Sequence, residues 1–168
     1  MTVLVAYGTT GGGTGEIAGW IADELGAAGL PVHLMPAGEV TDVAEYGALV
    51  LGSAVYATGW HADARQFARR FAGRFAGRPV WLFSSGPLDN SADKRELRPV
   101  SQVVKIATRV GAVEHVTFGG RLTKDAAGFM AKAIVRAGKG GDFRNPERIA
   151  AWSHTIATHL RPTEVPRG

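Results

Sequence analysis

A run of glycine and threonine residues between Gly8 and Ile17 is the part of the sequence best suited to chemistry. Glycines let successive backbone N–H groups point at one centre, and the helical pattern that begins at Ile17 adds the unpaired donors and the positive end of a helix. The run contains no lysine or arginine, so hydroxyl and backbone groups are its only donors. We therefore predict a phosphate-binding loop that consists of Thr9, Thr10, Gly11, Gly12, Gly13 and Thr14.

Three better-known nucleotide loops fit these residues less well. A P-loop requires lysine after its last glycine, and Gly13-Thr14-Gly15 lacks it. The Rossmann pattern G-x-G-x-x-G is absent. The loop of short-chain dehydrogenases would need glycine in place of Ile17, and neither Tyr46 nor Tyr56 is followed by the lysine that those enzymes carry four residues later.

The elements that must position this loop are short apolar segments alternating with helical patterns. Uninterrupted apolar segments are typical of strands buried on both faces, and strand–helix alternation predicts a parallel sheet covered by helices on both sides. Ligands of such sheets bind beyond the carboxyl ends of the strands. The predicted strands are Val3–Tyr7, Pro31–Met35, Ala48–Gly52, Pro79–Phe83 and His115–Phe118, and the predicted helical stripes are Ile17, Trp20, Ile21, Leu25 and Phe67, Phe71, Phe75.

Two further loops follow predicted strands at the same edge. The segment from Gly52 to His61 carries two aromatic residues, which suit a planar ligand: Tyr56 is the better stacking candidate, and Trp60 fits either stacking or packing at a helix start. The turn Ser84-Ser85-Gly86 offers hydroxyl and backbone donors. The five histidines show no metal-ligand spacing, so we predict no metal site.

These loops resemble those of flavodoxin-like proteins, in which a threonine-rich loop after the first strand wraps the phosphate of FMN. The resemblance implies a doubly wound five-stranded parallel sheet with strand order 2-1-3-4-5, and FMN bound at its edge. Gly11 is a departure, because a side-chain donor is common at that position. Beyond the first loop, the implied cofactor-binding residues are Ser53, Ala54, Val55, Tyr56, Trp60, Ser84, Ser85, Gly86 and Gly119.

Later motifs are similar to those of the menaquinone-dependent protoporphyrinogen dehydrogenase branch, namely Gly52–Tyr56, Phe118–Leu122 and Gly141–Arg144. That branch implies an FMN-dependent oxidoreductase that takes electrons from a small-molecule, protoporphyrinogen-like substrate and passes them to a quinone or another redox partner. No residue is assigned an acid–base role in catalysis. Two alternatives remain: a non-enzymatic electron carrier of the flavodoxin type, and the same fold with a deazaflavin cofactor.

Length and composition agree with one globular domain over residues 1–160 and a flexible tail over 161–168. The chain has no cysteine, so a bound cofactor must supply any redox chemistry. The net charge of +4 comes without a nucleic-acid signature, and electron-carrier flavodoxins are typically acidic. We expect a cytoplasmic protein in which five arginines between Arg65 and Arg78 solvate a helix face. The basic segment 121–141 fits peripheral contact with anionic lipid, a lid over the pocket, or a packing helix.

Overall fold

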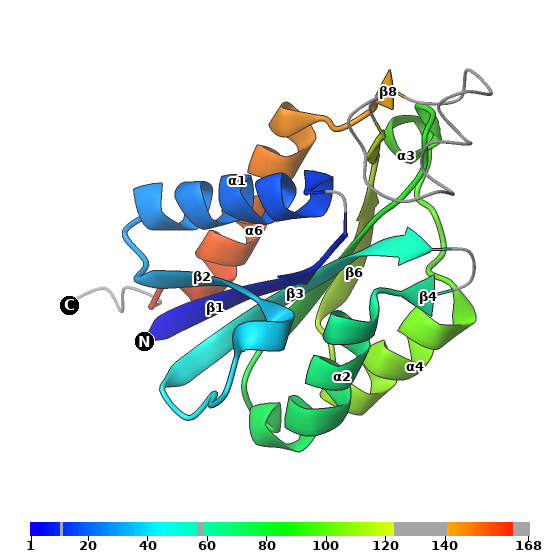
Figure 1. Cartoon of the computed structure of the whole chain (residues 1–168). Coiled ribbons are helices and arrows are strands. Elements are labelled where there is room, and N and C mark those ends of the chain that lie inside the picture. The colour runs from blue at the N-terminus through cyan, green and yellow to red at the C-terminus, as the bar shows by residue number, and fades with distance from the viewer. Residues whose placement is uncertain (11, 57–58, 123–140, 163–168) are drawn as a thin grey trace.

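The computed structural model describes residues 1–10, 12–56, 59–122 and 141–162, and its centre is a parallel sheet (Figure 1). Five strands follow the order β2-β1-β3-β5-β6, so the chain reverses direction across the sheet after β2, when it crosses to the other side of β1. This is the predicted order, and all five sequence-based strands start within one or two residues of the observed starts. The strands are β1 (Thr2–Gly8), β2 (Val32–Pro36), β3 (Tyr46–Tyr56), β5 (Val80–Ser85) and β6 (Glu114–Phe118).

Three very short strands extend this framework at the edge where the parallel strands end. Strand β4 (Gly59–Trp60) folds back antiparallel to the end of β3, and β7 (Arg121–Leu122) pairs with β8 (Gly141–Asp142) in a separate ribbon. The sequence did not predict them, because two residues are too few to show any period.

Helices cover both faces of the sheet (Figure 1). One face carries α1 (Gly13–Ala27) and α6 (Pro146–Leu160), and the other carries α2 (Ala62–Phe71) and α4 (Ser101–Val110). Asn145 caps α6 by accepting a hydrogen bond from the backbone N–H of Arg148, and Gly111 ends α4 with a φ of 64°. Shorter turns are η1 (Ala37–Glu39), η2 (Ala72–Phe75) and α3 (Ser91–Lys94).

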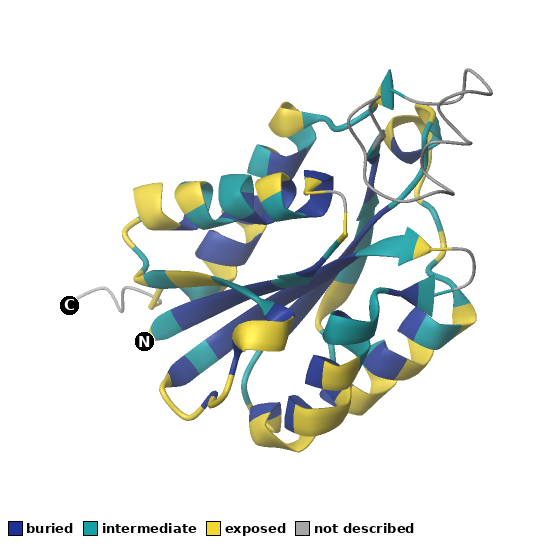
Figure 2. Ribbon diagram, in the orientation of Figure 1, coloured by how far each residue is buried: buried dark blue, intermediate teal, exposed yellow. Residues whose placement is uncertain are grey.

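The core consists of two apolar layers, one on each face of the buried central strands (Figure 2). On the α2 side, Phe67, Phe71 and Phe75 are buried, as their spacing predicts. On the α1 side, Ile17, Ile21 and Leu25 are buried, whereas Trp20 is only half-buried. Continuous burial of these strands explains why they read as unbroken apolar segments.

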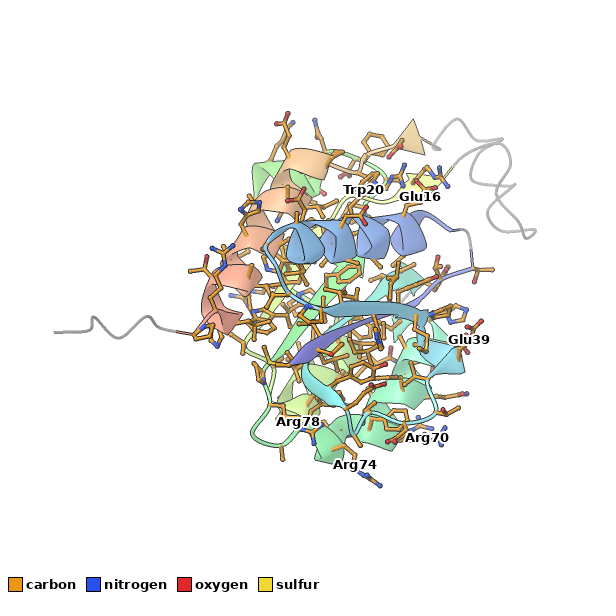
Figure 3. The ribbon with its side chains drawn as sticks, turned by 90° about the vertical axis from the view of Figure 1, so that its left-hand side faces the viewer. Glu16, Trp20, Glu39, Arg70, Arg74 and Arg78 are labelled. Atoms are coloured by element: carbon orange, nitrogen blue, oxygen red, sulfur yellow. The ribbon has the colours of Figure 1, made fainter. Side chains whose placement is uncertain are left out.

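The arginines of the α2 region do not all face solvent. Arg69, Arg70 and Arg74 are exposed, as expected for a solvated helix face. The Arg78 side chain instead points toward the segment before β3 and its first residue, where its Nη1 donates to the carbonyl oxygens of Val43 (3.1 Å) and Tyr46 (2.9 Å). Figure 3 shows Arg70, Arg74 and Arg78 on the same side of the molecule, away from Glu16 and Trp20. The expectation of five solvated arginines is therefore wrong for Arg78, and it is also wrong for the half-buried Arg65, whose Nε donates to the Trp60 carbonyl at 3.1 Å.

Within the described residues, no helix has the length and apolar character needed to cross a lipid bilayer.

Gly52 tests how tightly the core is packed. A Cβ at this position would lie 2.0 Å from Cζ of Phe83 on the neighbouring strand, so Gly52→Ala forces both strands to shift. We expect the free energy of unfolding, measured in urea, to fall by about 2 kcal/mol or more. Gly73→Ala is the control, since a Cβ there meets nothing within 4 Å and should leave stability unchanged or slightly higher. Equal effects of the two substitutions would contradict this packing.

Candidate cofactor-binding site

The carboxyl edge of the sheet is lined by a row of small and hydroxyl-bearing residues. The pairing register places Gly8 beside Ser53, Ser53 beside Ser84, and Ser84 beside Thr117, across four neighbouring strands. Gly8 is required for close packing, because a Cβ would lie 3.0 Å from Cβ of Ala64 on α2. The three loops selected from the sequence therefore begin side by side.

The first loop leads directly into α1 and leaves the start of that helix without a side-chain cap. Gly12 is the N-cap residue with a φ of 82°, a left-handed conformation that favours glycine. No side chain accepts a hydrogen bond from the first-turn N–H groups in the described part of the chain. Thr14 is buried, Thr9 is half-buried and Thr10 is exposed. Gly13 is buried, and Gly11 lies outside the described residues.

Tyr56 joins the first and second loops. Its hydroxyl accepts a 2.9 Å hydrogen bond from the backbone N–H of Thr10, although the two residues are 46 positions apart. The Tyr56 side chain is 43% exposed and makes an edge contact with the ring of His61, so part of its ring remains open to solvent. An oxygen atom thus already sits against one of the predicted phosphate donors.

Ser53 and Trp60 of the second loop are buried. The Ser53 hydroxyl accepts from the His61 N–H (2.9 Å) and donates to the Ala54 carbonyl (2.8 Å), which fixes the loop against the start of α2. Trp60 packs in the core with Ala64 and Phe67 of α2, and its contact with a cofactor stays a prediction. Ala54 and Val55 are half-buried, and Ala57 and Thr58 lie outside the described residues.

The third loop contains a buried polar network. The indole N–H of Trp60 donates to the Ser84 hydroxyl at 2.9 Å, and that hydroxyl lies 2.8 Å from Nε2 of His115. Nδ1 of His115 is buried without a partner among the described residues, and burial lowers the pKa of this histidine from 6.5 to about 4. Ser84 therefore links β4, β5 and β6.

Ser85, Gly86 and Gly119 complete the sequence-predicted set. Ser85 is buried on the opposite face of β5 from Ser84, and the Gly86 N–H donates to the Phe118 carbonyl at 3.2 Å. Gly119 is buried, and a Cβ there would lie 2.0 Å from the Phe143 carbonyl oxygen. Close approach of the 143 segment is thus a sufficient reason for glycine at this position.

Four charged side chains that the sequence analysis did not select surround the start of α1. The Arg144 guanidinium bonds both oxygens of Asp142 (2.9 and 2.8 Å) and one oxygen of Glu16 (2.7 Å), while Arg121 lies 3.1 Å from the other Glu16 oxygen. Arg144 also stacks over Trp20 at 4.7 Å, near the Glu16 and Trp20 positions labelled in Figure 3. The cluster ties the β7–β8 ribbon to α1.

Charge balance in this cluster keeps both carboxyl groups ionised. The hydrogen bond from Arg144 lowers the pKa of Glu16, with further help from the charges of Arg144 and Arg121. A hydrogen bond from Arg144 likewise lowers the pKa of Asp142, and the same bond raises the pKa of Arg144. Two cations offset two anions, so Glu16 does not make the first loop electronegative.

The sequence could not reveal this cluster by spacing. Arg121 and Arg144 are more than 100 positions from Glu16, and only the packing of the β7–β8 ribbon against α1 brings them together. The position of Gly13 beside Arg121 is equally non-local: a Cβ on Gly13 would lie 3.3 Å from Cβ of Arg121. A cation therefore lies next to a loop that carries none of its own.

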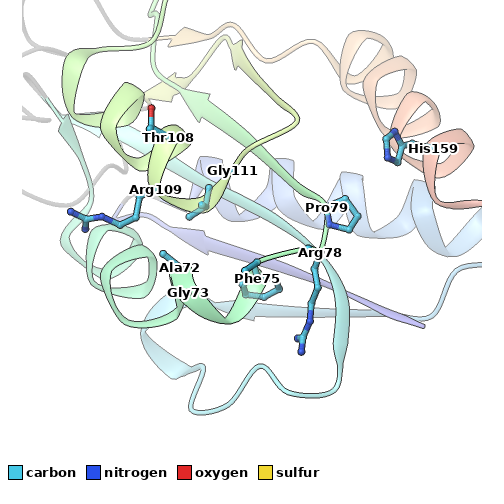
Figure 4. A pocket seen from close by; sticks show the side chains of 12 residues that line it. Ala72, Gly73, Phe75, Arg78, Pro79, Thr108, Arg109, Gly111 and His159 are labelled. Carbon is cyan, nitrogen blue, oxygen red and sulfur yellow. The ribbon is translucent and has the colours of Figure 1, made fainter.

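A cavity of about 610 Å³ lies at the end of the sheet opposite the three loops (Figure 4). Phe75, Arg78, Pro79, Gly111 and His159 are among its lining residues, and Pro79 directly precedes β5. It opens at the amino ends of the strands, where none of the three loops is found. Within the described residues no group of acidic or histidine side chains could hold a metal ion.

Comparison with known proteins places this geometry in a family. A family model described as a flavodoxin domain matches residues 4–141. A search of the curated proteins found no match. Among solved structures, flavodoxin 2 from Bacillus cereus is similar, with a TM-score of 0.64, 20% identity and coverage of 95% of this chain and 100% of that one.

Two other solved structures show the same fold. A flavodoxin from Streptococcus pneumonia TIGR4 has a TM-score of 0.59 and 17% identity, covering 95% of this chain and 100% of that one. Rubredoxin oxygen:oxidoreductase from Desulfovibrio gigas has a TM-score of 0.64 and 15% identity, covering 95% of this chain but 36% of that one. This chain thus spans about a third of that longer protein.

Removal of the central arginine should loosen the ribbon from α1. We expect Arg144→Met to lower the free energy of unfolding by about 1–3 kcal/mol at pH 7, because three charge-assisted hydrogen bonds are lost and the Glu16 and Asp142 carboxylates lose a partner. The exposed Arg109 provides the control substitution Arg109→Met.

The pH dependence of this difference has a definite sign. Both carboxyl groups have lowered pKa values in the folded state, so their stabilisation is complete above their ordinary values of 4.5 and 3.8 and is lost as the pH falls through the lowered values. The gap between wild type and Arg144→Met should therefore shrink as the pH falls below the ordinary values of 4.5 and 3.8. A gap that stays constant throughout the acid range below 3.8 would contradict the ion-pair account.

His115 should make the protein less stable in mild acid. The unfolded chain binds a proton near pH 6.5 and the folded chain only near pH 4, so stability falls as the pH drops through that window, by up to about 2–3 kcal/mol. His115→Gln should flatten the dependence of the unfolding free energy on pH between these values, as measured by urea unfolding. An unchanged slope in His115→Gln would show that other groups cause the loss.

Proposed function

The chain belongs to the flavodoxin domain family, and from this premise we propose that it binds FMN at the carboxyl edge of its sheet and transfers electrons through the flavin. The observation that carries the proposal is the start of α1, where Gly12 has a left-handed conformation and no described side chain caps the first N–H groups. Such a helix start is suited to an anion such as the terminal phosphate of FMN.

The residues fit this group. The N–H groups of Gly12, Gly13 and Thr14, with the Thr9 and Thr14 hydroxyls, are the donors that would hold the phosphate. The Tyr56 hydroxyl oxygen accepts from the Thr10 N–H, so this N–H is positioned to donate to an oxygen atom. Arg121 adds a positive charge beside Gly13 without being part of the loop.

Around the ring of the flavin, the chain would supply one open aromatic face and backbone donors. Tyr56 keeps part of its ring exposed at the edge, and the third loop begins beside it. When bound, FMN supplies the capacity to accept and release one or two electrons, while the protein orients the ring and excludes water from part of it. Trp60 and Ser84 would support the ring indirectly, because they bond to each other beneath the loops.

For the direction of electron flow, we propose an enzyme that takes electrons from a small molecule, such as a protoporphyrinogen-like compound, and passes them to a quinone or another acceptor. The net charge of +4 supports an enzyme over a carrier, since carriers of this family are typically acidic. The carrier is the second candidate, and a deazaflavin in place of FMN is a third. Most of the basic segment 121–141 lies outside the described residues, so its proposed lid, lipid-contact and packing roles rest on sequence alone.

Comparison of FMN with riboflavin tests the phosphate site. We expect FMN to bind at least about 100-fold more tightly than riboflavin, because only FMN engages several charge-assisted hydrogen bonds at the start of α1. Quenching of flavin fluorescence on titration with purified protein measures both constants.

A buried threonine supplies the matched variant for this comparison. Thr14→Val keeps the shape of the side chain but removes its hydroxyl, so it should weaken FMN by about tenfold and leave riboflavin unchanged. Equal affinity for the two flavins would refute the phosphate site. Tight binding of a deazaflavin with no binding of FMN would show that the cofactor is a deazaflavin and would leave the fold assignment unchanged.

A further inference from the structure

The positive charge of the protein is concentrated in three neighbouring elements, α2, η2 and α4. Together they carry six cationic residues and one acidic residue, a net charge of +5. The whole chain has a net charge of +4, so the remainder of the chain carries a charge of only −1. The acidic residue is Asp63, and the cationic residues are Arg65, Arg69, Arg70, Arg74, Lys105 and Arg109.

Five of these cations form one exposed surface. Helices α2 and α4 cover the same face of the sheet, and η2 contacts both (Figure 1). The side chains of Arg70 and Arg74 extend from the outer side of this layer in Figure 3. Within the described residues none of the five forms an ion pair. We refer to this surface as the basic face, and its exposed residues are Arg69, Arg70, Arg74, Lys105 and Arg109.

The basic face has few of the apolar groups on which stable protein interfaces depend. Its phenylalanines, Phe67, Phe71 and Phe75, are buried beneath it, and Val104 is the one large apolar side chain of α2, η2 and α4 that is exposed. Protein interfaces usually centre on aromatic or arginine anchors that insert into pockets of the partner. Attraction to an anionic bilayer needs no such pockets, because each basic residue near the surface adds its own favourable increment.

We propose that the basic face docks on the surface of an anionic lipid bilayer. A cluster of four to eight basic residues on amphipathic helices is the arrangement that binds anionic headgroups. The contact is peripheral, because no described helix is able to cross a bilayer. This places lipid contact on α2, η2 and α4, whereas the sequence alone suggested the segment 121–141.

Docking through this face is independent of the proposed flavin site. Helix α1 covers the opposite face of the sheet from α2 and α4, so its start stays accessible when the basic face meets a bilayer. The lipid experiment can therefore be read in the flavin-free protein. Failure of FMN to bind and failure to bind lipid are separate results.

The test is co-sedimentation of the full chain with vesicles of phosphatidylcholine, with and without phosphatidylglycerol. Titration with lipid gives an apparent dissociation constant per accessible lipid. We expect saturable binding to the vesicles with phosphatidylglycerol at low salt, weakening by about tenfold or more at high salt, where surface charges are screened. Vesicles of phosphatidylcholine alone should not bind.

Three matched variants, each of which removes three positive charges, locate the contact. Arg69→Gln/Arg74→Gln/Arg109→Gln should weaken binding about tenfold or more, because these exposed residues belong to the basic face. Lys94→Gln/Arg95→Gln/Arg98→Gln, which changes exposed residues outside that face, should stay within about threefold. The same small change is expected for Lys132→Gln/Arg136→Gln/Lys139→Gln, which tests the sequence-based segment.

A single charge reversal guards against loss of folding in the triple variant. Lys105→Glu alone should weaken binding about tenfold, with an unchanged urea-unfolding midpoint. The proposal is overturned if the protein does not bind anionic vesicles at low salt, if the three triple variants weaken binding equally, or if the 132–139 variant causes the loss. Tighter binding per phosphate to a DNA duplex of arbitrary sequence than to the vesicles would assign the basic face to nucleic acid and would also overturn it.

Discussion

The structure depends on the burial of five parallel strands, across which the chain reverses direction after β2. Because β1, β3 and β5 are parallel neighbours, their carboxyl ends and the loops that follow them emerge together at one edge of the sheet. The reversal places the α1 crossover on one face and the α2 and α4 crossovers on the other, so that the start of α1 lies at the same edge as the loops after β3 and β5. The chemistry proposed for this protein follows from that one arrangement.

Polar groups at this edge are divided between supporting and binding roles. The hydroxyls of Ser53 and Ser84 bond to other groups of the protein. Ser53 holds the second loop against α2, and Ser84 holds the third loop against Trp60 and His115. The N–H groups at the start of α1 have no such side-chain partners among the residues that the structure describes. Rigid support next to unsatisfied donors is the condition under which a site can bind an anion without first rearranging.

Local pattern predicted the fold well and the site less completely. The five long strands and the phenylalanine stripe of α2 follow from hydrophobic periodicity, whereas the strand order was implied by the resemblance to flavodoxin-like proteins. Two-residue strands such as β4 have no period. The Arg144 cluster, the His115 network and the inward turn of Arg78 each join residues that are far apart in the sequence, so none of these could be predicted from spacing. Gly119 was predicted to contact the cofactor, but the close approach of the Phe143 carbonyl is by itself a sufficient reason for glycine at this position.

Backbone amide signals give the most direct test of the central claim that the start of α1 holds the phosphate of a flavin. On addition of FMN to isotope-labelled protein, the signals of Gly12, Gly13 and Thr14 should shift strongly, while those of Gly73 and Gly111, at the opposite end of the sheet, should stay in place. Binding of FMN with no change at residues 12–14 would contradict the claim and would move the cofactor to another part of the fold.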